Sequence, residues 1–165
     1  MSTESPEKSS GLHTTIHFVR YGLPVFAVMA GIFAVSQVSG ATISESSIND
    51  SATGFFGRYT NEIAHFIEFF VLSGLVMRWR LAVKVPSGAG ELDPVMLRSA
   101  GQMAVLLALL YAVSDEAHQW FIADRSLGLV DLLVDLLIDG VGAVMGSAVY
   151  LSVFQAWRLQ RSRNN

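Results

Sequence analysis

The apolar positions of this chain are gathered into four long segments separated by polar stretches. The first segment, residues 21–38, holds no charged residue and has roughly the length that a helix needs to cross about 30 Å of hydrocarbon. A linker rich in Ser, Thr and Gly, residues 39–60, leads to the second segment, residues 63–77, which stops at a basic cluster. Arg20 and the small residues after the first segment also fit a cleaved signal peptide, but the long polar lead-in favours an uncleaved membrane helix.

The third and fourth segments predict two more helices. Asp93 can cap a helix and Pro94 suits its first turn, so a helix is expected to begin there and to continue through the charge-free residues 99–114. The fourth segment, residues 126–157, would be about 48 Å long as a helix, so its early part is expected to tilt, protrude or break. The predicted fold is all-α, an integral membrane bundle of four transmembrane helices.

The composition agrees with a membrane protein and excludes several other classes. Hydrophobic residues make up 52% of the chain and charged residues 15%, and the mean hydropathy of +0.45 is above the range of a soluble domain. The chain has no cysteine, which excludes disulfides and thiolate metal sites. Its basic residues form no patch interleaved with aromatics, so no nucleic acid is expected as a partner.

The basic residues predict the orientation of the four spans. One side would carry Lys8, Arg20, Arg78, Arg80, Lys84, Arg98, Arg158, Arg161 and Arg163. The other side would carry only Arg58 and Arg125, so both termini are predicted to be cytoplasmic and the protein to lie in the cytoplasmic (inner) membrane. Residues 1–18 then form a disordered cytoplasmic tail, residues 19–157 the four-helix membrane domain, and residues 158–165 a basic cytoplasmic tail.

Ionisable residues are concentrated where the third helix ends, in the stretch SDEAHQWFIADR at residues 114–125. Helical spacing places Asp115 on one face with His118 and Gln119, while Glu116 points elsewhere. The second helix enters from the same outer side and carries His65 and Glu68, three residues apart, on one face. These histidines and carboxylates are therefore expected to converge at the outer boundary of the membrane.

The fourth segment carries an acidic stripe that continues into glycines. Asp131, Asp135 and Asp139 recur every four residues and are followed in register by Gly142 and Gly146. A carboxylate near the bilayer centre costs about 2.5 to 3.5 kcal/mol on insertion scales, so this stripe is expected to face protein. Gly142 and Gly146 are expected to serve helix packing, because small residues let neighbouring backbones approach closely.

These motifs resemble the VanZ-like family, which is named after a teicoplanin-resistance accessory protein. AVSQVSG and the later SESS are similar to the family's Ser-Gln ending of the first helix and its serine-rich linker, and AHFIEFFVLSGL to its second helix. The most specific match is SDEAHQWFIADRS, which resembles the family's Asp-Glu-x-x-Gln-x-Phe-x-x-x-Arg motif. The resemblance covers nearly the whole chain beyond the N-terminal tail and implies a four-helix membrane protein.

The chain departs from the family pattern in two places. Asn61 and Glu62 stand where the family commonly has a basic residue before the second-helix histidine. The family's Asp-x-x-x-Asp/Asn-x-x-Gly-x-x-x-Gly block fits two registers, one starting at Asp131 with Ile138 in place of the first glycine, and one starting at Asp135 that restores both glycines. A four-residue slip keeps nearly the same helix face, so both registers stay open.

Three functions fit the outer cluster. The first is a protein that binds an envelope lipid, a lipid-linked precursor or an acylated glycopeptide-type antibiotic, with Arg125 pairing to an anionic group. The residues predicted to bind this ligand are Arg125, His65, Glu68, Asp115, Glu116, Gln119, Asp131, Asp135 and Asp139. The second is an enzyme acting on a lipid-linked substrate, with acid–base candidates His65, Glu68, Asp115 and Glu116. The third is a small proton-coupled transporter that uses the aspartate stripe as a relay, which needs a homo-oligomer for alternating access.

A structural role and a metal site are the remaining alternatives. His65 and Glu68 also fit a hydrogen-bonded pair that holds helices together, with Arg125 as counter-ion. No organic cofactor is expected, but a metal ion stays open, with His65, His118 and Asp115 as candidate ligands.

Overall fold

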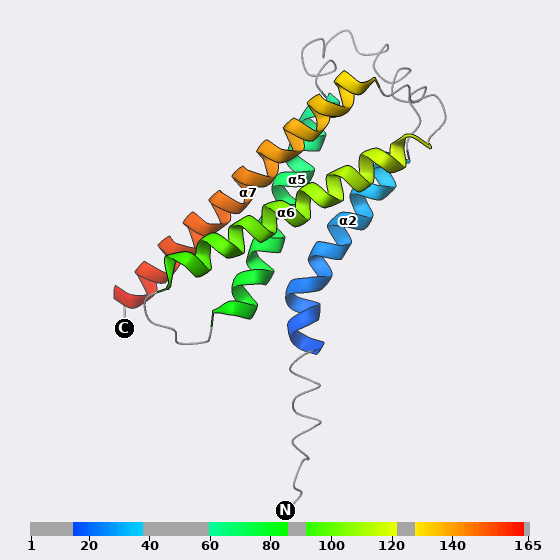
Figure 1. Cartoon of the computed structure of the whole chain (residues 1–165). Helices are drawn as coiled ribbons and strands as arrows, with labels where there is room; N and C mark the ends of the chain where they lie inside the picture. Colours follow the sequence, from blue (N-terminus) through cyan, green and yellow to red (C-terminus); the bar gives the residue numbers. More distant parts are fainter. Residues whose placement is uncertain (1–14, 38–59, 86–91, 122–127, 164–165) are drawn as a thin grey trace, which may run out of the picture.

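The computed structural model describes residues 15–37, 60–85, 92–121 and 128–163, and these residues contain four long helices and no strand (Figure 1). The first begins at residue 15, passes through a π-helical turn, η1 (Phe18–Gly22), and continues as α2 (Leu23–Ser36). The others are α5 (Thr60–Lys84), α6 (Pro94–Gln119) and α7 (Leu129–Arg163). The all-α prediction is confirmed for the described residues.

Local chemistry explains two of the helix boundaries. The Asp93 side chain accepts a hydrogen bond from the Val95 N–H at 2.9 Å, and Pro94 occupies the first turn, so the predicted start of α6 is confirmed. In η1 the Leu23 N–H donates to the Phe18 carbonyl, five residues back. The next residue, Pro24, has no N–H to donate, which favours such a local widening of the helix.

The ends of the described helices differ from the expected boundaries. Helical backbone begins at Thr15, inside the stretch expected to be a tail, because Ile16, Phe18 and Val19 extend the apolar run. The last helix is unbroken from Leu129 to Arg163, so the break that its length allowed does not occur within these residues.

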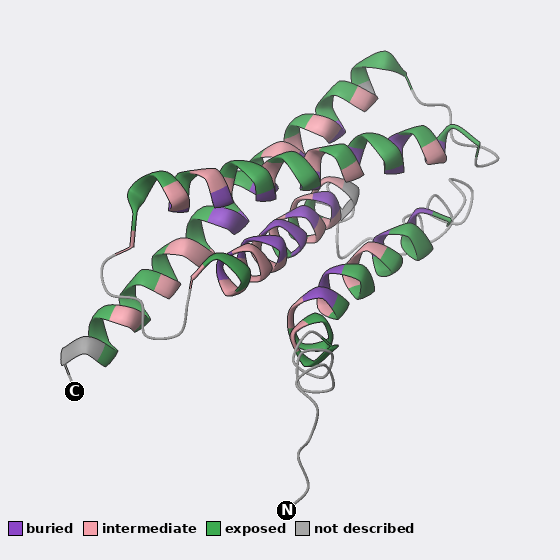
Figure 2. Cartoon of the chain, turned by 60° about the horizontal axis from the view of Figure 1, so that its bottom comes forward, coloured by how far each residue is buried: buried purple, intermediate pink, exposed green. Residues whose placement is uncertain are grey.

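Helix α5 lies inside the bundle and contacts α2, α6 and α7. Its fully buried side chains include Phe69, Leu72 and Met77, and α6 presents a row of alanines to the core. These alanines, all at 0% exposure, are Ala100, Ala104, Ala108 and Ala112. Figure 2 shows that the outward faces of the helices are largely exposed, and many of their residues are large and apolar, as expected for contact with lipid.

Two glycines bring α7 against α5. A Cβ atom at Gly142 would lie 2.6 Å from the Phe66 carbonyl oxygen, and one at Gly146 would overlap the Phe70 carbonyl oxygen. Beside this contact the hydroxyls of Ser73 and Ser147, both buried, form a hydrogen bond of 2.5 Å between the two helices. The glycines therefore fix the register of α7 on α5.

Three helical stretches are long and apolar enough to cross a membrane: Thr15–Ser36, Pro94–Gln119 and Leu132–Arg161. Helix α5 has the length, since 25 residues rise about 38 Å, but Glu62, Glu68, Arg78 and Arg80 interrupt its apolar stretch. An interior helix faces protein on most sides, so it needs less apolar surface than a helix surrounded by lipid.

Candidate functional site

Buried polar side chains from all four helices gather at one end of the bundle. Figure 1 shows that the C-terminal ends of α2 and α6 lie at the same end as the N-terminal ends of α5 and α7. We use the name polar cluster for the buried residues Ser36, His65, Asp115, Glu116, Gln119, Asp135 and Asp139. Burial of so many polar groups costs free energy unless they are paired, so each group is expected to have a hydrogen-bond partner.

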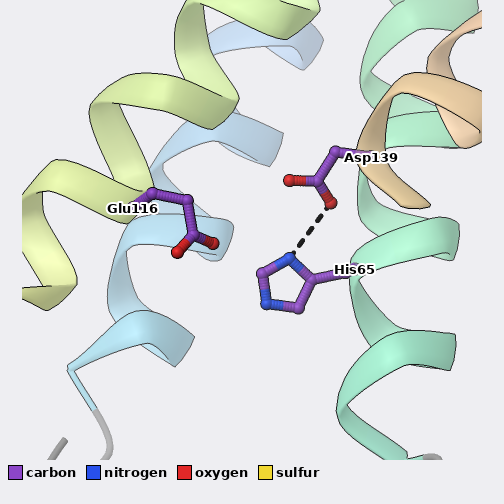
Figure 3. Close-up of side chains that lie close together, drawn as sticks. All are labelled: His65, Glu116 and Asp139. Atoms are coloured by element: carbon purple, nitrogen blue, oxygen red, sulfur yellow. Dashed lines mark hydrogen bonds and ion pairs between the residues drawn. The ribbon is translucent and has the colours of Figure 1, made fainter. Parts of the chain in front are cut away.

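The centre of the polar cluster is a trio from three helices: His65 on α5, Glu116 on α6 and Asp139 on α7. His65 Nδ1 lies 3.0 Å from Asp139 Oδ1, a hydrogen bond between α5 and α7. Figure 3 shows the Glu116 carboxylate pointing from α6 toward this pair, and one ligand atom from each of the three side chains lies within 4.8 Å of the others. We call these three residues the polar trio.

The two carboxylates of the polar trio are incompletely paired. Both oxygens of Glu116 and the Oδ2 atom of Asp139 are buried and have no hydrogen-bond partner among the described residues. The exposed fraction of Glu116 is 1% and that of Asp139 is 0%, so bulk water does not solvate them. The trio therefore has the capacity to hold a cation or a proton.

The glycine contact between α5 and α7 positions the polar trio. Gly142 lies three residues after Asp139, and its backbone touches Phe66, the residue after His65. Close approach of the two backbones at this level brings the short aspartate side chain within bonding distance of the imidazole.

Asp115 faces a different helix from its neighbour Glu116. The Ser36 hydroxyl, at the end of α2, lies 2.8 Å from both Asp115 oxygens and 3.0 Å from the Ile32 carbonyl, and the charged acceptor forms the stronger bond. Gln119 Nε2 donates to Asp115 Oδ2 at 2.8 Å, as the four-residue spacing predicts. This carboxylate is therefore paired, unlike that of Glu116.

His118 follows Asp115 by three residues and contacts the same end of α2. Its Nε2 atom contacts Gln37 Nε2, and its ring packs on Phe33 with 4.6 Å between the ring centroids. The three candidate metal ligands named from the sequence, His65, His118 and Asp115, do not form one group of ligands. Instead, in the part of the chain that the structure describes, the one group of three such ligands is the polar trio.

Comparison with known proteins agrees with these motifs. A family model described as VanZ/LLP1 matches residues 2–155. The chain belongs to the VanZ-like family. Searches of the curated proteins and of the solved structures found no match.

In this VanZ-like protein the motifs of separate helices meet in space. Ser36 and Gln37, from the Ser-Gln ending of the first helix, contact Asp115 and His118 of the third-helix motif. Sequence reasoning did not single out Ser36 and Gln37 as site residues. The sequence feature that indicates them is a polar pair at the C-terminal end of an otherwise apolar helix, at the same end of the bundle as the acidic motif.

The remaining predicted residues lie around the polar cluster or outside the described chain. Glu68 is half-buried, and His65 forms its hydrogen bond with Asp139 in place of the alternative pairing with Glu68. Asp135 is buried one turn before Asp139. Arg125 and the side chain of Asp131 lie outside the described residues.

An apolar cavity of about 430 Å³ lies between α2, α5 and α6. Its lining includes Val25, Met29, Leu72, Val76, Leu107 and Tyr111. Tyr111 precedes Asp115 by one turn and donates a hydrogen bond of 2.5 Å to the Met29 carbonyl. The cavity continues along α5 as far as Arg80 and Val83.

Proposed function

We propose that this VanZ-like protein binds an amphiphilic molecule of the cell envelope. The polar cluster would take the headgroup and the cavity between α2, α5 and α6 would take a hydrocarbon chain. A lipid, a lipid-linked precursor and an acylated glycopeptide-type antibiotic all have this chemistry. The observation that carries the proposal is an apolar cavity whose lining residue Tyr111 stands one turn from the buried Asp115 of the polar cluster.

The dimensions of the cavity suit a hydrocarbon chain. Its volume lies in the range of small-molecule sites, and its lining is almost entirely apolar. Along α5 it extends from Leu72 to Val83, a rise of about 16 Å, or roughly half the hydrocarbon thickness of a bilayer. A lipid chain in the bilayer already lies in hydrocarbon, so van der Waals packing against the cavity lining would stabilise the complex.

The residues that we propose for headgroup binding carry both signs of charge, the acids from the polar cluster and Arg125 from the sequence motif. Asp115, Glu116 and Asp139 would orient cationic or hydroxyl groups. Arg125 would pair with a phosphate or carboxylate by two parallel N–H donors. The link of the family name to teicoplanin resistance supports an acylated antibiotic among the ligands.

We also propose four membrane spans, with α5 as the fourth, and cytoplasmic termini. The helices alternate in direction, and most basic residues lie at the end opposite the polar cluster. The cluster would then face the outer side of the cytoplasmic membrane, where envelope precursors and antibiotics are found.

A tryptophan substitution in the cavity tests this function. Leu107 lines the cavity, so Leu107→Trp is expected to weaken binding of a fluorescent phospholipid to the detergent-solubilised protein at least tenfold, or about 1.4 kcal/mol. Leu110→Trp is the matched control, since Leu110 is an exposed leucine of α6 outside the cavity lining. Displacement of the probe by undecaprenyl phosphate or by teicoplanin would identify the ligand class, and equal binding by both variants would refute the cavity as the site.

A further inference from the structure

We infer that the polar trio of His65, Glu116 and Asp139 binds a divalent transition-metal ion, with zinc as the ion of first choice. The inference goes beyond the proposed function, because the metal site needs no amphiphile to form. Its ligands also differ from the candidates named from the sequence, which were His65, His118 and Asp115.

The donor set fits this class of ion. An imidazole nitrogen and two carboxylate oxygens from three helices give three protein ligands and leave a fourth position open for water or a ligand. Imidazole suits zinc and other transition metals, whereas magnesium and calcium favour sites made of oxygen alone. The chain has no cysteine, so no thiolate competes for the ion.

The unpaired oxygens are the second, independent observation. Glu116 is 1% exposed, and both of its carboxylate oxygens lie buried without a hydrogen-bond partner among the described residues. In Figure 3 this carboxylate points into the same space as the His65 ring and Asp139. A buried, unpaired carboxylate is strongly destabilising, and a divalent cation between Glu116 and Asp139 would offset that cost for both.

The His65–Asp139 hydrogen bond already brings two of the three donor atoms together. His65 Nδ1 and Asp139 Oδ1 lie 3.0 Å apart, and a metal ion bound to both would replace the proton that they share. Donor atoms in a tetrahedral zinc site lie about 3.4 Å apart, so the trio, now within 4.8 Å, has to contract slightly. Glu116 can rotate inward without breaking a hydrogen bond recorded for the described residues.

Elemental analysis of the full chain tests the site. The protein is purified in detergent with a tag that lacks histidine, exposed to Zn²⁺ and dialysed. We expect about one zinc ion per wild-type chain. Glu116→Gln and His65→Gln are expected to lower the zinc content at least tenfold. Glu68→Gln and His118→Gln are the matched controls, and they are expected to retain the ion because neither residue belongs to the trio.

Two further measurements keep the test decisive if a variant fails to fold. Zn²⁺ is expected to raise the Tm of the wild-type protein, since a ligand that binds only the folded state stabilises it. X-ray absorption on the wild-type protein is expected to show one imidazole among oxygen ligands. Absence of zinc, equal zinc in all variants as an adventitious ion only, or two imidazole ligands would overturn the inference. Phospholipid binding by Leu107→Trp is measured separately, so the two proposals fail independently.

Discussion

Ser36 shows how one hydroxyl supports a buried charge. It ends α2 at 2.8 Å from both oxygens of Asp115, which also accepts a hydrogen bond from Gln119. Asp115 is 4% exposed, so water cannot easily replace a lost donor.

We predict that Ser36→Ala lowers the free energy of unfolding by about 1–3 kcal/mol, measured by thermal or chemical denaturation in detergent. Ser152→Ala, which removes an exposed hydroxyl bonded to Ala148 of its own helix, should change it by about 0.5 kcal/mol or less. Equal effects would contradict the role of Ser36.

At the scale of the helices, the glycine contact determines how closely α5 and α7 pack. Gly146 allows the two backbones to touch, because a Cβ atom there would overlap the Phe70 carbonyl oxygen. Gly146→Ala should therefore force the helices apart and destabilise the fold by about 1–3 kcal/mol. Gly101→Ala is the matched control on α6: nothing lies within 4 Å of its Cβ position, so the better helix propensity of alanine should stabilise the fold by about 0.5–1 kcal/mol. Unfolding measured for both variants should give changes of opposite sign, and destabilisation by both would argue against this contact.

The orientation of the whole molecule can be measured on a chain without cysteine. Single cysteines introduced by substitution would be the sole targets of a membrane-impermeant maleimide. We predict that Asn49→Cys and Ser126→Cys are labelled from outside intact cells, whereas Ser87→Cys and Ser162→Cys are labelled only after lysis. These positions lie between or after the four proposed spans, and the distribution of basic residues sets the direction. Labelling of Ser87→Cys in intact cells, or protection of Ser126→Cys, would invert the topology and place the polar cluster at the cytoplasmic face.

Local signals in the sequence predicted much of the architecture. The charge-free runs mark helices because an apolar stretch of that length has few other stable environments. The start of α6 follows from Asp93 and Pro94, which act on the backbone within two residues. The gathering of acids and histidines at one end also follows, since an alternating bundle brings the ends of α2 and α6 beside the starts of α5 and α7. The motifs that carry the family resemblance are equally local, and the family match confirms the resemblance.

The tertiary structure decided which of these residues became partners. Asp115 and Glu116 are neighbours in sequence, yet one pairs with Ser36 on α2 and the other faces His65 and Asp139 on α5 and α7. His65 meets Asp139 across 74 positions, and not Glu68 on its own helix, because the glycines of α7 set how closely and in what register α7 lies on α5. The sequence by itself determined which segments are helices and which ends carry charge, because those depend on spacing within a helix. Partner choice in the polar cluster depends on distances between helices, which packing alone fixes.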